Sequence, residues 1–165
     1  MPVKSPDPRR RPRITFLMRR LQQHYARDID TALRESGFSD IRAGQAQVIP
    51  FVPPEGRSVG ELAVAAGVTK QTMAQSVDQL VRAGYLERQP NPRDARSQLL
   101  FLTDRGQAVR AVAASAGDSV EQRWAELTSP AQLDAHRRFL EQLLGQLDGT
   151  EPDTDLGPRR KGVRG

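Results

Sequence analysis

The chain has 165 residues, which is enough for one domain of ordinary size but too few for two independent enzymatic domains. Lys and Arg number 25 against 20 Asp and Glu, and the resulting net charge of +5 favours polyanionic partners. The chain has no cysteine, which excludes disulfides, thiolate zinc sites and cysteine nucleophiles. No stretch approaches the roughly 18 apolar residues that span a bilayer, so we expect a cytoplasmic protein without membrane contact.

The charge is concentrated at the two ends. Residues 1–13 contain five basic and one acidic side chain, and residues 149–165 contain four and three. Residues 14–148 are left with 16 of each, so a polyanion site in this part must be a local patch. Both ends lack hydrophobic periodicity and are rich in Pro or Gly, which predicts a disordered basic tail over 1–13, an ordered part over 14–148 and a second disordered tail over 149–165.

The ordered part begins with the pattern of a long amphipathic helix. Apolar residues recur every three or four positions from Ile14 to Leu33, and Gly37 ends the pattern. We expect a shorter helix across Ala43 to Phe51, followed by the prolines at 53 and 54.

Two short helices and a hairpin are expected next. Ser58 and Glu61 form a capping box that opens a helix through residue 66, and Thr69 caps a second helix that ends before Gly84. The pattern then becomes extended, which predicts strands over 85–89 and 97–102 joined by a seven-residue loop over 90–96.

Two long helices complete the ordered part. Thr103 caps a helix that runs to residue 127, and Ser129 with Pro130 and Gln132 starts the last one. The apolar positions of the last helix are expected to face inward: Leu133, Leu140, Leu143, Leu144 and Leu147. The fold class predicted is mainly α, with six helices and one β-hairpin.

A helix, a tight turn at Gly67, a second helix and a charged hairpin follow the order of a winged helix-turn-helix. On a helical wheel, the second helix directs Met73, Val77 and Leu80 to one face, which must pack on the domain. The opposite face is rich in amide side chains. Gln pairs bidentately with an adenine edge and Thr contacts a thymine methyl, so we expect Gln71, Thr72 and Gln75 to read the major groove of DNA. Lys70 and Ser76 are placed for phosphate. The alternative is a face that is merely solvated.

The hairpin tip carries Arg93, Asp94 and Arg96. A guanidinium on such a loop can enter the narrow minor groove of A·T-rich DNA. Asp94 lies two residues from Arg96 and is expected to hold that guanidinium in an extended pose. The alternative is an exposed loop with a weak surface ion pair.

The segment from Gly60 to Gly106 resembles the MarR family of bacterial transcriptional regulators. The matching positions are Glu61, Leu62, Ala63, Gly67, Val68, Thr69, Leu80, Gly84, Glu87, Arg88, Asp94, Arg96, Leu102, Thr103 and Gly106. The resemblance implies a winged helix-turn-helix over 57–106 and dimerisation helices over 14–36 and 107–148. It also implies a homodimeric repressor on a pseudo-palindromic operator, with Thr69 to Ser76 in the major groove and Arg96 in the minor groove. Release by a small aromatic or anionic ligand is implied as well.

No catalytic constellation, phosphate loop or metal-ligand spacing is recognisable, so we expect neither an enzyme nor a cofactor or metal site. His24 and the single tryptophan, Trp124, are candidates for lining a ligand pocket, although a surface role for the histidine and a packing role for the tryptophan are the alternatives. Two other functions stay open: a winged helix that binds protein, and an architectural protein that binds DNA without sequence preference.

Overall fold

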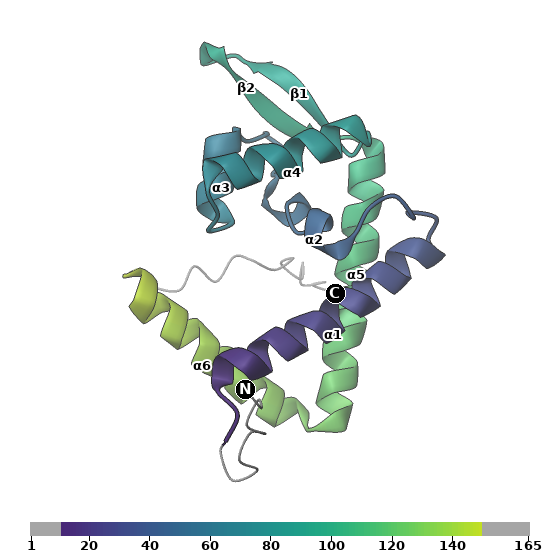
Figure 1. Cartoon of the computed structure of the whole chain (residues 1–165), viewed down its shortest axis with the longest axis vertical. Helices are drawn as coiled ribbons and strands as arrows, with labels where there is room; N and C mark the ends of the chain where they lie inside the picture. Colours follow the sequence, from purple (N-terminus) through teal and green to yellow (C-terminus); the bar gives the residue numbers. More distant parts are fainter. Residues whose placement is uncertain (1–10, 150–165) are drawn as a thin grey trace, which may run out of the picture. The chain divides into compact units, whose positions relative to one another are not determined.

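The computed structural model describes residues 11–149, so the predicted tails lie outside the described residues at positions 1–10 and 150–165. The described part forms α1 (Ile14–Glu35), α2 (Ala43–Ala46), the 3-10 turn η1 (Ile49–Phe51), α3 (Val59–Ala65), α4 (Lys70–Arg82), β1 (Leu86–Asn91), β2 (Asp94–Leu102), α5 (Asp104–Leu127) and α6 (Pro130–Asp148) (Figure 1). The predicted fold class, with six helices and one antiparallel hairpin, is confirmed. Among these helices, none is long and apolar enough to cross a membrane.

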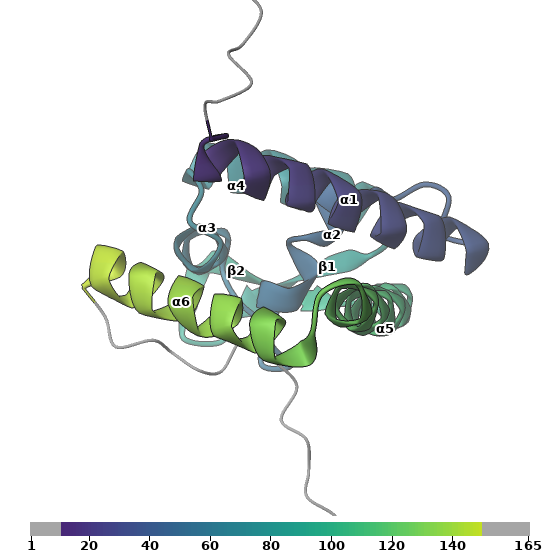
Figure 2. The same ribbon diagram turned by 90° about the horizontal axis from the view of Figure 1, so that it is seen from below.

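The chain divides into two compact units, residues 1–120 and residues 121–165. The first unit contains every element from α1 to β2 and most of α5. The second contains the last residues of α5 and all of α6. Figure 2 looks along α5, the helix that both units share.

The starts of α3, α4, α5 and α6 follow local capping chemistry, as the sequence predicted. The Ser58 hydroxyl accepts a hydrogen bond from the Glu61 backbone N–H, and the Glu61 carboxylate accepts one from the Ser58 N–H at 2.8 Å. The hydroxyls of Thr69 and Ser129 cap α4 and α6 in the same way, and the Thr103 hydroxyl accepts from the Gly106 N–H at the start of α5. Each cap satisfies an N–H group that has no partner within its own helix.

The helix predicted over 43–51 is wrong as a single element. It ends at Ala46, and a separate 3-10 turn follows at Ile49–Phe51. Pro50 explains the break, because proline has no N–H to donate to the Ala46 carbonyl four residues earlier.

The predicted boundaries of the hairpin are also wrong. The strands reach Asn91 on one side and Asp94 on the other, so only Pro92 and Arg93 lie between them. Pairing is not continuous: Pro90 lies opposite Gln98, but the next residue, Asn91, lies opposite Asp94. Residues 95 to 97 therefore form a bulge in β2.

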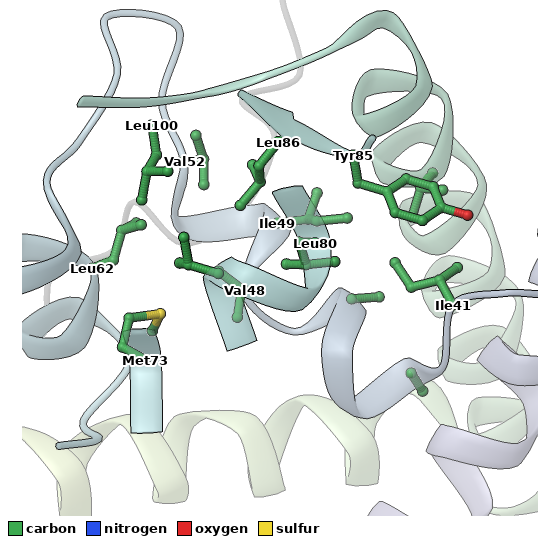
Figure 3. Packing of buried hydrophobic residues seen from close by; sticks show 14 of the residues in the cluster. Ile41, Val48, Ile49, Val52, Leu62, Met73, Leu80, Tyr85, Leu86 and Leu100 are labelled. Atoms are coloured by element: carbon green, nitrogen blue, oxygen red, sulfur yellow. The ribbon is translucent and has the colours of Figure 1, made fainter. Parts of the chain in front are cut away.

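The hydrophobic core joins both helices of the helix-turn-helix to the base of the hairpin (Figure 3). Leu62 comes from α3, Met73 and Leu80 from α4, Leu86 from β1 and Leu100 from β2, and each is at most 2% exposed. Because one apolar cluster holds all four elements, the position of the hairpin relative to α4 is fixed by packing.

Gly106 allows the start of α5 to touch the backbone between α4 and β1. A Cβ atom at position 106 would lie 2.2 Å from the carbonyl oxygen of Tyr85. The Thr103 hydroxyl donates to the Gly84 carbonyl at 2.6 Å across the same junction. A glycine is therefore required here by close approach of two backbones.

Two helices leave apolar faces uncovered. In α1, Ile29 and Leu33 are buried, but Ile14, Leu17 and Leu21 are 45–64% exposed. In α6 the prediction of inward-facing leucines is wrong within the described chain, because no residue of this helix is buried and Leu144 and Leu147 are 56% and 72% exposed. The apolar period of α6 is present, but these leucines remain in contact with water.

Candidate nucleic-acid interface

The second helix of the helix-turn-helix, α4, has one buried and one exposed face, as predicted. Met73, Val77 and Leu80 are at most 2% exposed. The predicted contact residues on the other face of α4 and at its cap are exposed, except Ser76, which is half-buried: Thr69, Lys70, Gln71, Thr72, Gln75 and Ser76. The fold thus places all six side chains along the first two turns of one helix.

The hydroxyl groups of this surface are already engaged. The Thr72 hydroxyl is hydrogen-bonded to that of Thr69 with the two oxygens 2.9 Å apart, and the Ser76 hydroxyl donates to the Thr72 carbonyl at 3.2 Å. These hydrogen bonds fix the side-chain rotamers of Thr72 and Ser76. Thr72 therefore keeps its Oγ1 at the helix cap and its methyl group in one position on an exposed side chain.

The amide groups of α4 fall into two classes. Gln79 accepts a hydrogen bond from the Gln45 side chain of α2 at 3.0 Å, so it is held by the protein. Gln71 and Gln75 have no hydrogen-bond partner among residues 11–149. These are the two glutamines of α4 whose amide groups are available to a ligand.

Two contacts that the sequence did not predict fix the hairpin to the helices. The Arg88 guanidinium of β1 forms an ion pair with Asp78 of α4 at 2.5 Å. Arg57, just before α3, pairs with Leu100 of β2 through two backbone hydrogen bonds of 3.2 and 2.9 Å. The hairpin is thus held at its base by α4 and by the segment that leads into α3.

At the hairpin tip, Arg93 and Arg96 are exposed. Contrary to the prediction, Asp94 does not bind the Arg96 guanidinium. Its carboxylate accepts a hydrogen bond from the Arg96 backbone N–H at 3.0 Å. Asp94 therefore orients the main chain that carries Arg96 and leaves the guanidinium without an ion pair among the described residues.

A polar network lies at the junction of α1, α4 and α5, and the sequence did not predict it. The Tyr85 hydroxyl donates to Asp40 at 2.5 Å, and the Arg105 guanidinium donates to both oxygens of the same carboxylate. Arg105 also stacks over the Tyr85 ring at 4.4 Å. The hydrogen bond from Tyr85, together with Arg105, lowers the pKa of Asp40. Burial, followed by the contact with Asp40, raises the pKa of Tyr85 to about 12.

Arg110 of α5 contacts the turn that precedes α3. Its guanidinium donates to the backbone carbonyls of Ile49 and Val52. Burial lowers its pKa, but the shift starts from the high value of a guanidinium. The carbonyls of the first residue of η1 and of the residue that follows η1 thereby share a charged donor.

The two residues proposed from the sequence to line a ligand pocket lie in different units of the chain. His24 is exposed on α1, and Trp124 is half-buried in the last turn of α5. Within residues 11–149, no group of three His, Asp or Glu side chains lies close enough to hold a metal ion.

The order α3, turn, α4 and an anchored hairpin defines this protein as a winged helix-turn-helix protein. A sequence model of the MarR family matches residues 37–97. An uncharacterised protein of Mycobacterium tuberculosis is 30% identical over 106 residues, which cover 64% of this chain and 74% of the relative. The chain belongs to the MarR family.

Solved structures of the family have the same fold. The reduced form of MarR from E. coli aligns with a TM-score of 0.68 at 23% identity, over 82% of this chain and 98% of MarR. The transcriptional repressor CouR, bound to a 23-mer DNA duplex, aligns with a TM-score of 0.67 at 25% identity, over 80% of this chain and 92% of CouR. MepR from S. aureus, also in a DNA complex, aligns with a TM-score of 0.68 at 21% identity, over 83% and 99% of the two chains.

Proposed function

We propose that this protein is a sequence-specific, double-stranded DNA-binding transcriptional regulator that represses as a homodimer. The observation that carries the proposal is the exposed amide face of α4 beside a hairpin that the core holds in place. CouR and MepR, which have this fold, were solved with DNA. In a winged helix-turn-helix the second helix enters the major groove, and α4 occupies that place here.

On this proposal, α4 reads A·T pairs. Gln71 and Gln75 carry free amides, each able to donate a hydrogen bond to adenine N7 and to accept one from the adenine N6 amino group in a bidentate pair. The methyl group of Thr72 is fixed in position and complements the methyl group of thymine. Lys70, Thr69 and Ser76 contact phosphates on either side, where they contribute affinity rather than sequence preference.

The hairpin contacts the adjacent minor groove through Arg96, with Arg93 beside it. A·T-rich segments have a narrow minor groove with an enhanced negative potential, so both parts of the surface favour the same base composition. The middle of the chain has no net charge, which makes this local placement of guanidinium groups more important than the overall charge.

The homodimer follows from the uncovered apolar faces of α1 and α6. Thirteen large hydrophobic side chains of the described residues are at least 37% exposed, and most of them lie on these two helices. An exposed apolar face of this size on a helix marks an interface. A two-fold symmetric dimer presents two copies of α4 to two half-sites of a pseudo-palindromic operator, roughly 34 Å apart.

We infer release by a small aromatic or anionic ligand from membership of the family. We propose His24 and Trp124, each considered by itself, as residues that contact such a ligand. Trp124 is the single tryptophan of the chain, so its fluorescence reports on binding directly. A ligand that changes this fluorescence and also dissociates the DNA complex supports a role of Trp124 in ligand binding. If the ligand still dissociates the DNA complex of the Trp124→Phe variant at the same concentration, Trp124 has no such role.

Selection of bound sequences from a random duplex pool tests the main proposal. We expect an A·T-rich motif with dyad symmetry whose half-sites are centred about one helical turn apart. Binding without any recovered motif would favour a non-specific architectural protein. No duplex binding at all would favour a winged helix that binds protein instead.

A further inference from the structure

The two arginines at the tip of the hairpin are carried by an irregular main chain. Arg93 occupies the two-residue turn, and Arg96 lies in the bulge formed by residues 95 to 97. Neither backbone segment is held by regular strand pairing. Something else must keep these residues in place if their side chains are to enter a groove in a defined orientation.

Pro92 accounts for the irregularity. Two-residue hairpins favour turns in which the first central residue has a positive φ, because that twist matches the twist of the strands. The ring of proline fixes φ near −65°, so Pro92 excludes such a turn. The remaining turn types splay the strands, and the bulge in β2 accommodates the mismatch.

The side chain of Asn91 replaces the missing pairing on both sides of the turn. Its Oδ1 accepts a hydrogen bond from the Arg93 backbone N–H at 3.0 Å. Its Nδ2 donates to the Ser97 hydroxyl at 2.9 Å, and that hydroxyl donates to the Asp94 carbonyl at 3.1 Å. One half-buried amide thus ties the turn to the bulge.

Asp94 continues this chain of contacts to the second arginine. Its carbonyl is held by Ser97, and its carboxylate accepts from the Arg96 N–H at 3.0 Å. The main chain of Arg93 is therefore held directly by Asn91, and that of Arg96 indirectly. The guanidinium groups themselves are exposed and have no ion pair within the described residues.

We propose that Asn91 is the positioning residue of the hairpin, whose amide orients the backbone of Arg93 and, through Ser97 and Asp94, of Arg96 for entry into the minor groove. This inference rests on the proposed DNA-binding function. An amide is suited to the role because it donates and accepts at once, and one side chain can thus bridge a backbone N–H and a hydroxyl. A hairpin that is already ordered loses less conformational freedom on binding DNA.

The test compares full-length variants on the duplex that the selection recovers, by fluorescence anisotropy. Asn91→Ala is expected to weaken binding about 3- to 10-fold, the effect of losing one or two neutral hydrogen bonds. Ser97→Ala, which removes the link to the bulge only, is expected to cost less. Gln89→Ala is the matched control, since Gln89 is an exposed amide on the same strand whose side chain donates to Glu87 and to no other group among residues 11–149. An equal effect of Asn91→Ala and Gln89→Ala would overturn the inference.

A second measurement separates positioning from a general loss of structure. The A·T pairs under the hairpin are replaced by G·C, which puts an amino group into the minor groove, or by inosine·C, which does not. Wild type is expected to prefer inosine·C over G·C, and Asn91→Ala and Arg96→Ala are both expected to lose that preference. A preference that Asn91→Ala retains, with affinity lowered equally on all duplexes, would show a merely structural role.

A mutant cycle that combines Asn91→Ala with the substitutions of the two arginines is the third measurement. In the Arg93→Ala/Arg96→Ala background, adding Asn91→Ala is expected to change affinity less than 2-fold, because a positioning residue has nothing left to position. A full effect in that background would overturn the inference. If wild type itself shows no sequence-dependent duplex binding, the proposed function fails before Asn91 is tested.

Discussion

Helix α4, in the winged helix-turn-helix core, and helix α6 both repeat apolar residues every three or four positions, but only α4 has its apolar face covered by the rest of the chain. Leu62, Leu80 and Leu100 are at most 1% exposed, whereas Leu144 and Leu147 are 56% and 72% exposed. Hydrophobic period therefore reports which face of a helix is apolar and says nothing of what covers it. In the core the cover comes from α3 and the hairpin, and on α6 we propose that it comes from a second copy of the chain.

The largest effect is expected from placing charge on the uncovered face of α6. Leu144→Glu with Leu147→Glu should convert a two-chain species into a monomer, because each carboxylate buried without a partner costs on the order of several kcal/mol. Sedimentation velocity at micromolar concentration measures this.

Gln142→Glu with Gln146→Glu is the matched control, as it adds the same charge to the same helix away from the leucines. A wild-type protein that sediments as a folded monomer would contradict the proposal that a second copy of the chain covers α6.

Within the core, truncation of one side chain should destabilise the fold itself. Leu80→Ala is expected to lower the free energy of unfolding by about 2–5 kcal/mol, since it leaves a cavity among well-packed neighbours. Val64→Ala, at a position that is 84% exposed, should change it by less than about 0.5 kcal/mol. Denaturant unfolding compares the two, and a similar cost at both positions would contradict the described core.

A smaller loss of folding stability is expected where α5 meets the backbone of Tyr85. Gly106→Ala should cost roughly 1–3 kcal/mol, because the added methyl group meets a carbonyl oxygen that cannot move freely. Gly44→Ala is the control: nothing lies within 4 Å of its Cβ position, and removing a glycine from a helix should be neutral or stabilising. If both substitutions behave alike in thermal unfolding, the close approach is not present in solution.

The smallest effect depends on pH and involves Asp40. Its pKa is lower in the folded protein than the ordinary value of 3.8, so its contribution to stability is present above that value and declines as the pH falls through the lower folded pKa. Asp40→Asn should therefore lower the melting temperature at pH 7 but have little effect near pH 2. Calorimetric scans of both proteins across this range measure the difference, and an effect that does not shrink in acid would contradict the ion pair with Arg105.

The sequence predicted the local features of the fold correctly for a physical reason. The caps at Ser58, Thr69, Thr103 and Ser129 each depend on residues within three positions, and the buried face of α4 depends on helical period alone. Such features need no knowledge of distant parts of the chain.

The features that the sequence did not predict depend on distant partners or on side-chain bonding. The contacts of Arg57 with Leu100 and of Asp40 with Arg105 join segments that become neighbours only in the fold. The predicted boundaries of the hairpin were wrong because the amide of Asn91 replaces strand pairing across the bulge. The signal for the break after α2 was present, since Pro50 lies inside the helix that we predicted.

The most direct test of the central claim compares wild type with Gln71→Ala/Gln75→Ala on the selected duplex and on a scrambled duplex of equal composition, over a range of salt concentrations. Each bidentate pair contributes roughly 1–3 kcal/mol of discrimination, so the variant should lose most of its preference for the selected duplex while the salt dependence of binding stays unchanged. A variant that retains the full preference of wild type would contradict the assignment of α4 as the helix that reads DNA.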